Sequence, residues 1–181
     1  MISLVDQRRL LVYARQVLEA RVRRQAPPAL ERGGPFDEHA GAFVTIHHRG
    51  DLRGCLGRIE PRSPLTETIA DLAASVSDSD PRFRAVSALE LADIDIEISI
   101  LTPHRDIHSI DAIEIGRHGL IVEDGPRRGL LLPQVATEQA WDRETFVSHT
   151  CLKAGLPADA WRHGARLYVF EAHVFGEDMN G

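Results

Sequence analysis

The run ADIDIEISIL, residues 92–101, limits the folds open to this chain more than any other stretch of its sequence. Apolar and polar residues alternate strictly along it, with Ile94, Ile96, Ile98 and Ile100 in one set and Asp95, Glu97 and Ser99 in the other. Side chains of a β-strand point alternately to the two faces of a sheet, so this spacing predicts a strand with one apolar and one polar face. Such a strand is typical of an antiparallel sheet that is covered on one side.

Two further stretches read as hairpins, and the segments between them read as helices. The hairpins are expected at GAFVTIHHRGDLRGCLGRI, residues 41–59, and at GLIVEDGPRRGLLLP, residues 119–133, and ARLYVFEAHVF supplies a closing strand. Helices are expected after Ser3, after Ser63 and Pro64 as cap and first position, at TEQAW, and from Asp142 to a stop at Gly155. Without regular strand–helix–strand alternation, this pattern predicts an α+β fold, mainly antiparallel sheet flanked by helices.

Length and charge narrow the function classes. A chain of 181 residues fits one domain or two small interwoven halves, and a formal charge of −6 argues against broad capture of nucleic acid. No run approaches the roughly 20 apolar residues of a membrane span, and the N-terminus lacks the unbroken apolar core of a signal peptide. We therefore expect a cytoplasmic protein with no nucleic-acid or membrane partner and two reduced cysteines.

The stretch GDLRGCLGRIEP, residues 50–61, holds one of these cysteines, Cys55. On a strand, Arg53 and Cys55 share a face, where a guanidinium would favour the thiolate and bind an anion. Gly54 and Gly57 lack a Cβ and would admit a ligand or another backbone. The alternative is that Cys55 is a small buried hydrophobe without reactivity.

A nucleophilic thiol needs a base and an orienting group. His118, in GRHGL, is our preferred base, and Glu97 is a second candidate that would orient an imidazole or act as an acid. No metal site is predicted, because His47 and His48 are adjacent on a strand and face opposite ways, and His104 and His108 follow Pro103 in a loop. Cys151 shares a helical stripe with Val147 and Ala154 and is expected in the core. Common hydrolase and nucleotide-binding fingerprints are absent, and no cofactor is identified.

Six segments in order resemble the AMMECR domain family, component A of the AmmeMemoRadiSam system: LRGCLG, DPRF, EISIL, GRHGL, GLLLPQVATEQAW, and CLKAGL followed by Trp161. The resemblance implies an α+β fold of two unequal, interwoven subdomains. We expect a single domain over 1–181 with a smaller subdomain around 41–90 inserted in a larger one, 1–40 plus 91–181. The polar stretch SVSDSD departs from the alanine-rich family pattern.

The resemblance also carries over a set of site residues: Cys55, His118 and Glu97 as catalytic candidates, and Arg53, Gly54, Gly57, Asp80, Arg82, Gln134 and Glu138 as candidates for binding substrate. The family has no settled reaction, but its association with a Memo-like protein and a radical SAM protein implies a shared modification pathway.

Our leading hypothesis is a cytoplasmic enzyme, or an enzyme-pathway component, that acts on a small or peptide-like substrate. Cys55 would be the nucleophile or a substrate-binding thiol, Arg53 an anion anchor, and His118 or Glu97 the proton-transfer group. The alternative is a non-catalytic module that docks a protein partner through the same glycine-rich surface. Nucleic-acid binding is a third hypothesis.

Overall fold

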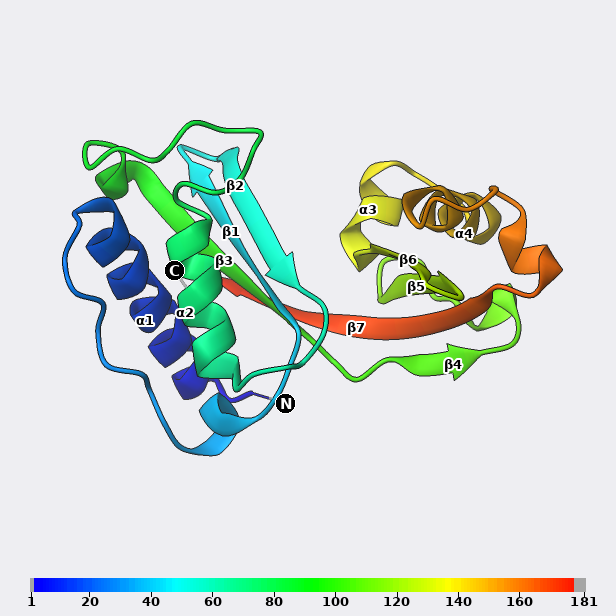
Figure 1. The fold of residues 1–181 in the computed structure, drawn as a ribbon, viewed down its shortest axis with the longest axis horizontal. Coiled ribbons are helices and arrows are strands. Elements are labelled where there is room, and N and C mark those ends of the chain that lie inside the picture. Colours follow the sequence, from blue (N-terminus) through cyan, green and yellow to red (C-terminus); the bar gives the residue numbers. More distant parts are fainter. Residues whose placement is uncertain (1, 178–181) are drawn as a thin grey trace. The chain divides into compact units, whose positions relative to one another are not determined.

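The computed structural model describes residues 2–177, which divide into two compact units (Figure 1). Unit 1 takes the described residues up to Ile100 and those from His173 onward, and unit 2 takes Leu101–Ala172. In the sequence, unit 2 is thus inserted between the two parts of unit 1, and the smaller subdomain expected around 41–90 stays a prediction. Within unit 1, Leu10 from the first helix and Val44 from the first strand share one hydrophobic core.

The sheet of unit 1 contains β1 (Ala42–His48), β2 (Asp51–Arg58) and β3 (Ile94–Leu101). Both pairings of β1 are antiparallel, and β1 lies between β3 and the edge strand β2. A β-bulge between Ile46 and His47 shifts the register of the β1–β2 hairpin. The long strand β7 (Arg166–Gly176) contributes residues 166–172 to unit 2 and 173–176 to unit 1.

Two helices, α1 (Leu4–Val22) and α2 (Leu65–Ser75), pack side by side in unit 1 (Figure 1). Ser3 caps α1 as predicted, with its Oγ accepting the Asp6 N–H at 3.1 Å. The predicted cap of α2 is wrong by one residue. Its cap position is Pro64, not Ser63, and Pro64 makes no side-chain cap bond. The chain is held there instead by the Leu65 N–H, which donates to the Glu38 carbonyl at 2.8 Å.

The helices cover the apolar face of the sheet, as the isoleucine spacing of β3 predicts. Ile94, Ile96 and Ile98 are at most 2% exposed and belong to the same cluster as the inner residues of α1 and α2. Short 3₁₀ segments at Gly34–Asp37 and Leu91–Asp93 complete unit 1. No helix in the described part of the chain is long and apolar enough to cross a membrane.

Unit 2 pairs β5 (His118–Asp124) with β6 (Arg127–Leu131) and with β7, and β7 also pairs with the short β4 (Arg105–Ile107). Its helices are α3 (Pro133–Glu138) and α4 (Arg143–Lys153), with 3₁₀ turns at Ile110–Ala112 and Ala160–His163. The helix expected at TEQAW, residues 137–141, instead begins at Pro133 and ends at Glu138. The missing N–H of a proline leaves no hydrogen bond unmade in the first turn of a helix.

The predictions for α4 are confirmed. The Asp142 carboxylate caps the helix by accepting the Thr145 N–H at 2.8 Å, and Gly155 follows it at φ +72°. Cys151 is fully buried in the core of unit 2, and burial raises the pKa of its thiol. It is a packing residue, as its helical stripe indicates.

Candidate functional site

Three polar side chains form a row across the sheet of unit 1. Thr45 on β1 is paired with Cys55 on β2 and with Glu97 on β3. Directly paired residues of antiparallel strands project from the same face, so the three side chains are neighbours. Thr45 Oγ1 donates a hydrogen bond to Cys55 Sγ at 3.3 Å. We call these three residues the thiol row.

The thiol row lies on the face of the sheet that is turned away from α1 and α2. Gly54, next to Cys55, points to the helices, because a Cβ there would come within 3.0 Å of Val76. Alternation then places the Cys55 side chain on the opposite face. All three members of the row are half-buried. The Glu97 carboxylate forms no hydrogen bond or ion pair with any other residue that the structure describes.

Both glycines of the motif have a packing role. Gly57 is paired with Phe43, and a Cβ at Gly57 would come 2.1 Å from the ring. The ring of Phe43 therefore lies over Gly57, on the same face as Cys55. Gly54 makes room for α2 in the same way. At both glycines the space left by the missing side chain is filled by another residue of the protein, Val76 at Gly54 and Phe43 at Gly57. Contact of a ligand with Gly54 or Gly57 stays a prediction.

The Arg53 side chain donates all of its observed hydrogen bonds to the loop that precedes β3. Its Nε donates to Glu90 Oε1 at 2.9 Å, and its other nitrogens donate to the carbonyls of Arg84 and Ala85 at 2.9 and 3.3 Å. The Arg53 and Glu90 side chains are 11% and 14% exposed. The Arg53 guanidinium, with the Ser87 N–H, lowers the pKa of Glu90 to about 2. A role for Arg53 as an anion anchor would require this ion pair to open.

Asp80 and Arg82, from the DPRF segment, bind the free edge of β2. The Asp80 carboxylate is 2% exposed and accepts the Cys55 N–H at 2.9 Å. It also accepts the Arg82 N–H at 3.1 Å and two guanidinium bonds at 3.0 and 2.8 Å. The guanidinium bonds first, then the two backbone N–H groups, hold the pKa of Asp80 far below its usual range although burial opposes this. The pair fixes the backbone of Cys55 and protects an edge that would otherwise stay unpaired.

The other three predicted residues belong to unit 2. His118 on β5 is 3% exposed, and its Nδ1 accepts the Glu114 N–H at 3.0 Å. A neutral imidazole that accepts at Nδ1 carries its proton on Nε2. Gln134 and Glu138 are four residues apart on α3, half-buried and exposed respectively. Within unit 1 the structure brings Cys55, Glu97, Asp80 and Arg82 together, and a partnership of His118 with Cys55 stays a prediction.

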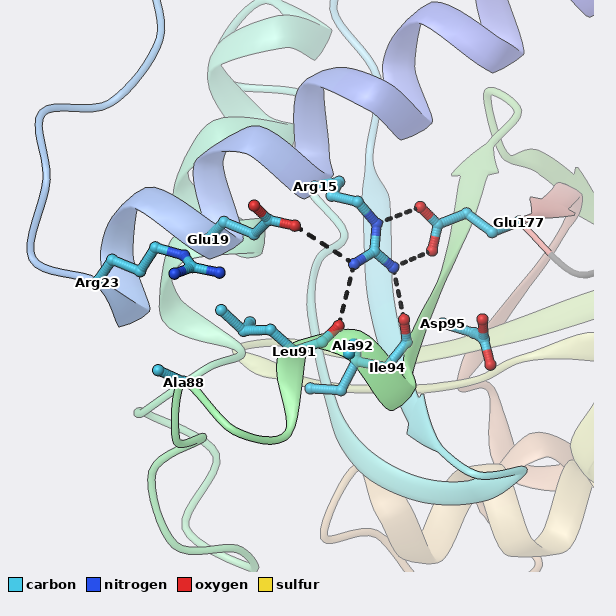
Figure 2. Close-up of a pocket in the computed structure, with 9 residues that line it drawn as sticks. All are labelled: Arg15, Glu19, Arg23, Ala88, Leu91, Ala92, Ile94, Asp95 and Glu177. Carbon is cyan, nitrogen blue, oxygen red and sulfur yellow. Dashed lines mark hydrogen bonds and ion pairs between the residues drawn. The ribbon is translucent and has the colours of Figure 1, made fainter.

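A separate pocket of ≈ 450 Å³ opens in unit 1 near the end of α1 (Figure 2). Figure 2 shows the Arg15 guanidinium beside the Glu177 carboxylate, to which it donates two hydrogen bonds of 2.6 and 2.5 Å. Arg15 also donates to the carbonyls of Leu91 and Ile94. Glu177 in turn accepts the Ile96 N–H at 2.8 Å. Arg15 thus holds the end of the described chain against α1 through Glu177. None of the residues that line the pocket is among the predicted site residues.

Comparisons with known proteins agree on one family. The AMMECR1 family model matches residues 11–175. A protein of Methanosarcina mazei is 42% identical over 187 residues, covering 98% of this chain and 94% of the relative, and Protein MJ0810 of Methanocaldococcus jannaschii is 47% identical over 151 residues, covering 78% and 75%. The crystal structure of the uncharacterized protein PH0010 from Pyrococcus horikoshii superposes with a TM-score of 0.85 at 36% identity, covering 93% of this chain and 90% of that one. The chain therefore belongs to the AMMECR1 family.

Proposed function

We propose that this protein is a thiol-dependent enzyme, or a component of an enzyme pathway, in which Cys55 attacks an electrophilic atom of a small or peptide-like substrate. The observation that carries the proposal is the hydrogen bond from Thr45 Oγ1 to Cys55 Sγ on the face turned away from the helices. A hydroxyl aimed at the sulfur orients the thiol and supplies a donor to the thiolate when it forms.

Glu97 is the proton acceptor in this proposal. Its carboxylate lies in the same row as the sulfur, one strand beyond Thr45, and has no bonded partner in the described chain. Two strand spacings separate Cys55 from Glu97, roughly 9–10 Å between backbones, which leaves space for a substrate group or a water between their side chains. Glu97 is preferred to His118, because the Nδ1 atom of His118 is already occupied and its neutral ring holds its proton on the other nitrogen.

The surrounding bonds make the nucleophile rigid. Asp80 and Arg82 fix the backbone of Cys55 from the free edge of β2, and pairing with β1 fixes it from the other side. A reacting group held on a strand by bonds on both edges loses little entropy when the substrate binds. The Memo-like and radical SAM partners implied by the family resemblance belong to this proposal as proteins that supply or consume the modified substrate.

The test measures the reactivity of Cys55 in a chain with no other thiol. In a Cys151→Ala background we expect iodoacetamide to label Cys55 in the folded protein, with mass spectrometry locating the adduct. Thr45→Val keeps the shape of the side chain and removes the donor, so labelling should slow several-fold, whereas Thr137→Val, at an exposed position of α3, should leave the rate unchanged. If Cys55 resists labelling until the protein unfolds, the enzyme proposal fails and the docking module takes its place.

A further inference from the structure

The arginines nearest to Cys55 have their charges neutralised by carboxylates. Arg82 approaches the Cys55 carbonyl at 3.4 Å but is paired with Asp80 at 2.8 Å. Arg53, two residues before the cysteine, is paired with Glu90 at 2.9 Å. Arg84, from the same loop, is exposed, where water and salt screen its charge most strongly. These guanidinium groups therefore give the thiol row little net positive charge.

No described cation neutralises the negative charge of the Glu97 carboxylate. The residue is half-buried and lies in the row with the sulfur, and its carboxylate forms no ion pair or hydrogen bond with another described residue. The hydroxyl between the two groups, on Thr45, already gives its proton to the sulfur and has none left for the carboxylate. A charge that is partly shielded from water and unpaired attracts a counter-charge more strongly than an exposed one.

We infer that the substrate of the thiol row carries a positive charge, an ammonium or guanidinium group, close to the atom that Cys55 attacks. The inference rests on the proposed function and adds the class of substrate to it. It also reverses the expectation from the sequence, in which Arg53 would select an anion. In the bound state the cation pairs with the Glu97 carboxylate and gives it the counter-charge that none of the described residues provides.

Methanethiosulfonate reagents of different charge test the inference without knowledge of the substrate. The Cys55 thiolate attacks the sulfenyl sulfur, a disulfide forms and methanesulfinate leaves, so atoms and electrons balance for all reagents. We would compare trimethylammonioethyl, sulfonatoethyl and methyl methanethiosulfonate on the Cys151→Ala protein. Each rate is divided by the rate with N-acetylcysteinamide, a neutral thiol, which removes the intrinsic reactivity of the reagents.

The expected ratio follows from Coulomb's law. With a solvent-like dielectric constant of about 80 and a separation of about 6 Å, one negative charge changes each charged reagent's rate by roughly threefold, in opposite directions. The corrected ratio of cationic to anionic rates should therefore be about tenfold at low salt and should fall as salt screens the charge. Glu97→Gln should bring the ratio close to one. Asp71→Asn removes a carboxylate that is 64% exposed on α2, beyond the opposite face of the sheet, and should leave the ratio unchanged.

The outcomes separate the two proposals. If none of the three reagents modifies Cys55 in the folded protein, the proposed function fails, because the thiol is not accessible. If the neutral reagent reacts but the corrected ratio is one or lower, only the charge of the substrate is overturned. The same conclusion follows if Glu97→Gln and Asp71→Asn lower the ratio equally, since the preference would then come from the overall charge of the protein. Circular dichroism and the melting temperature establish that each variant is folded.

Discussion

Replacing Glu90 by Gln should destabilise unit 1 by an amount that depends on pH. The change leaves the Arg53 guanidinium, 11% exposed, without its carboxylate partner. Lowering a carboxyl pKa from 4.5 to about 2 corresponds to about 3 kcal/mol of stability, which partial exposure to solvent reduces to about 2 kcal/mol. Because the folded pKa lies below the unfolded one, this contribution is complete above about pH 5 and is lost as the pH falls through 2.

Urea denaturation followed by circular dichroism measures the effect, since α1 and α2 both belong to unit 1. We expect Glu90→Gln to lower the free energy of unfolding by about 2 kcal/mol at pH 7 and by much less at pH 2.5. Glu144→Gln is the matched control, because Glu144 also pairs with an arginine, Arg162, but is 57% exposed, so its loss should cost less than about 0.5 kcal/mol. Combining Glu90→Gln with Arg53→Met measures the coupling directly.

Two results would refute this reasoning. The first is an equal effect of Glu90→Gln and Glu144→Gln, which would mean that the Arg53–Glu90 pair is as well screened as a surface pair. The second is a loss of stability that is the same at pH 7 and pH 2.5, which would assign the effect to packing and not to charge.

Three further predictions concern other parts of the chain. Cys151→Ala removes a fully buried sulfur, so it should cost on the order of 1 kcal/mol of stability and lower the melting temperature. Labelling of Cys55 should stay intact in this variant. An unchanged melting temperature would contradict the role of Cys151 in the core. Gly57→Ala should cost about 1–3 kcal/mol in denaturation experiments, because its Cβ would lie 2.1 Å from Phe43, and Phe43→Leu in the same chain should recover most of the loss. A neutral effect of Gly57→Ala alone would show that the ring moves freely. Gel-shift titration should detect no tight binding of random duplex DNA or RNA, since the net charge is −6, and binding that weakens steeply with salt would revive the nucleic-acid hypothesis.

The elements could be predicted from the sequence where local chemistry decides them. The isoleucine spacing of β3 predicts its covered face, because every second side chain of a strand points to the same side of the sheet. The isoleucines therefore form the apolar surface on which α1 and α2 pack. Ser3 and Asp142 cap their helices through bonds to residues three positions away, so a short window of sequence contains the whole interaction.

The thiol row could not be predicted because it depends on register. The turn at Arg49 and Gly50, both at positive φ, pairs His48 with Asp51. Counting back from that pair would place Thr45 opposite Gly54, and only the β-bulge moves it to Cys55. Nothing near the turn marks the bulge in the sequence. The sequence therefore does not single out Thr45, although it predicts the strand in which Thr45 lies.

The sequence does not indicate the partner of Arg53 either, for a different reason. Glu90 follows it by 37 positions, in a loop without a recognisable pattern. Alternation along β2 indicates which face Arg53 shares with Cys55, but it does not say which carboxylate the chain brings to its guanidinium. The same limit applies to the bounds of the two units, which depend on contacts between the first and last described segments of the chain.

The interruption of unit 1 by unit 2 sets an order of events during synthesis. Unit 2 is one continuous segment, Leu101–Ala172, and all of its contacts become available as soon as that segment has left the ribosome. Unit 1 still lacks the end of β7 at that moment, and Arg15 on the first helix lacks the carboxylate that binds it through two bonds until Glu177 emerges. The sheet that carries Cys55 is thus completed only after unit 2, and a chain that stalls before residue 177 would present its thiol on an incomplete sheet.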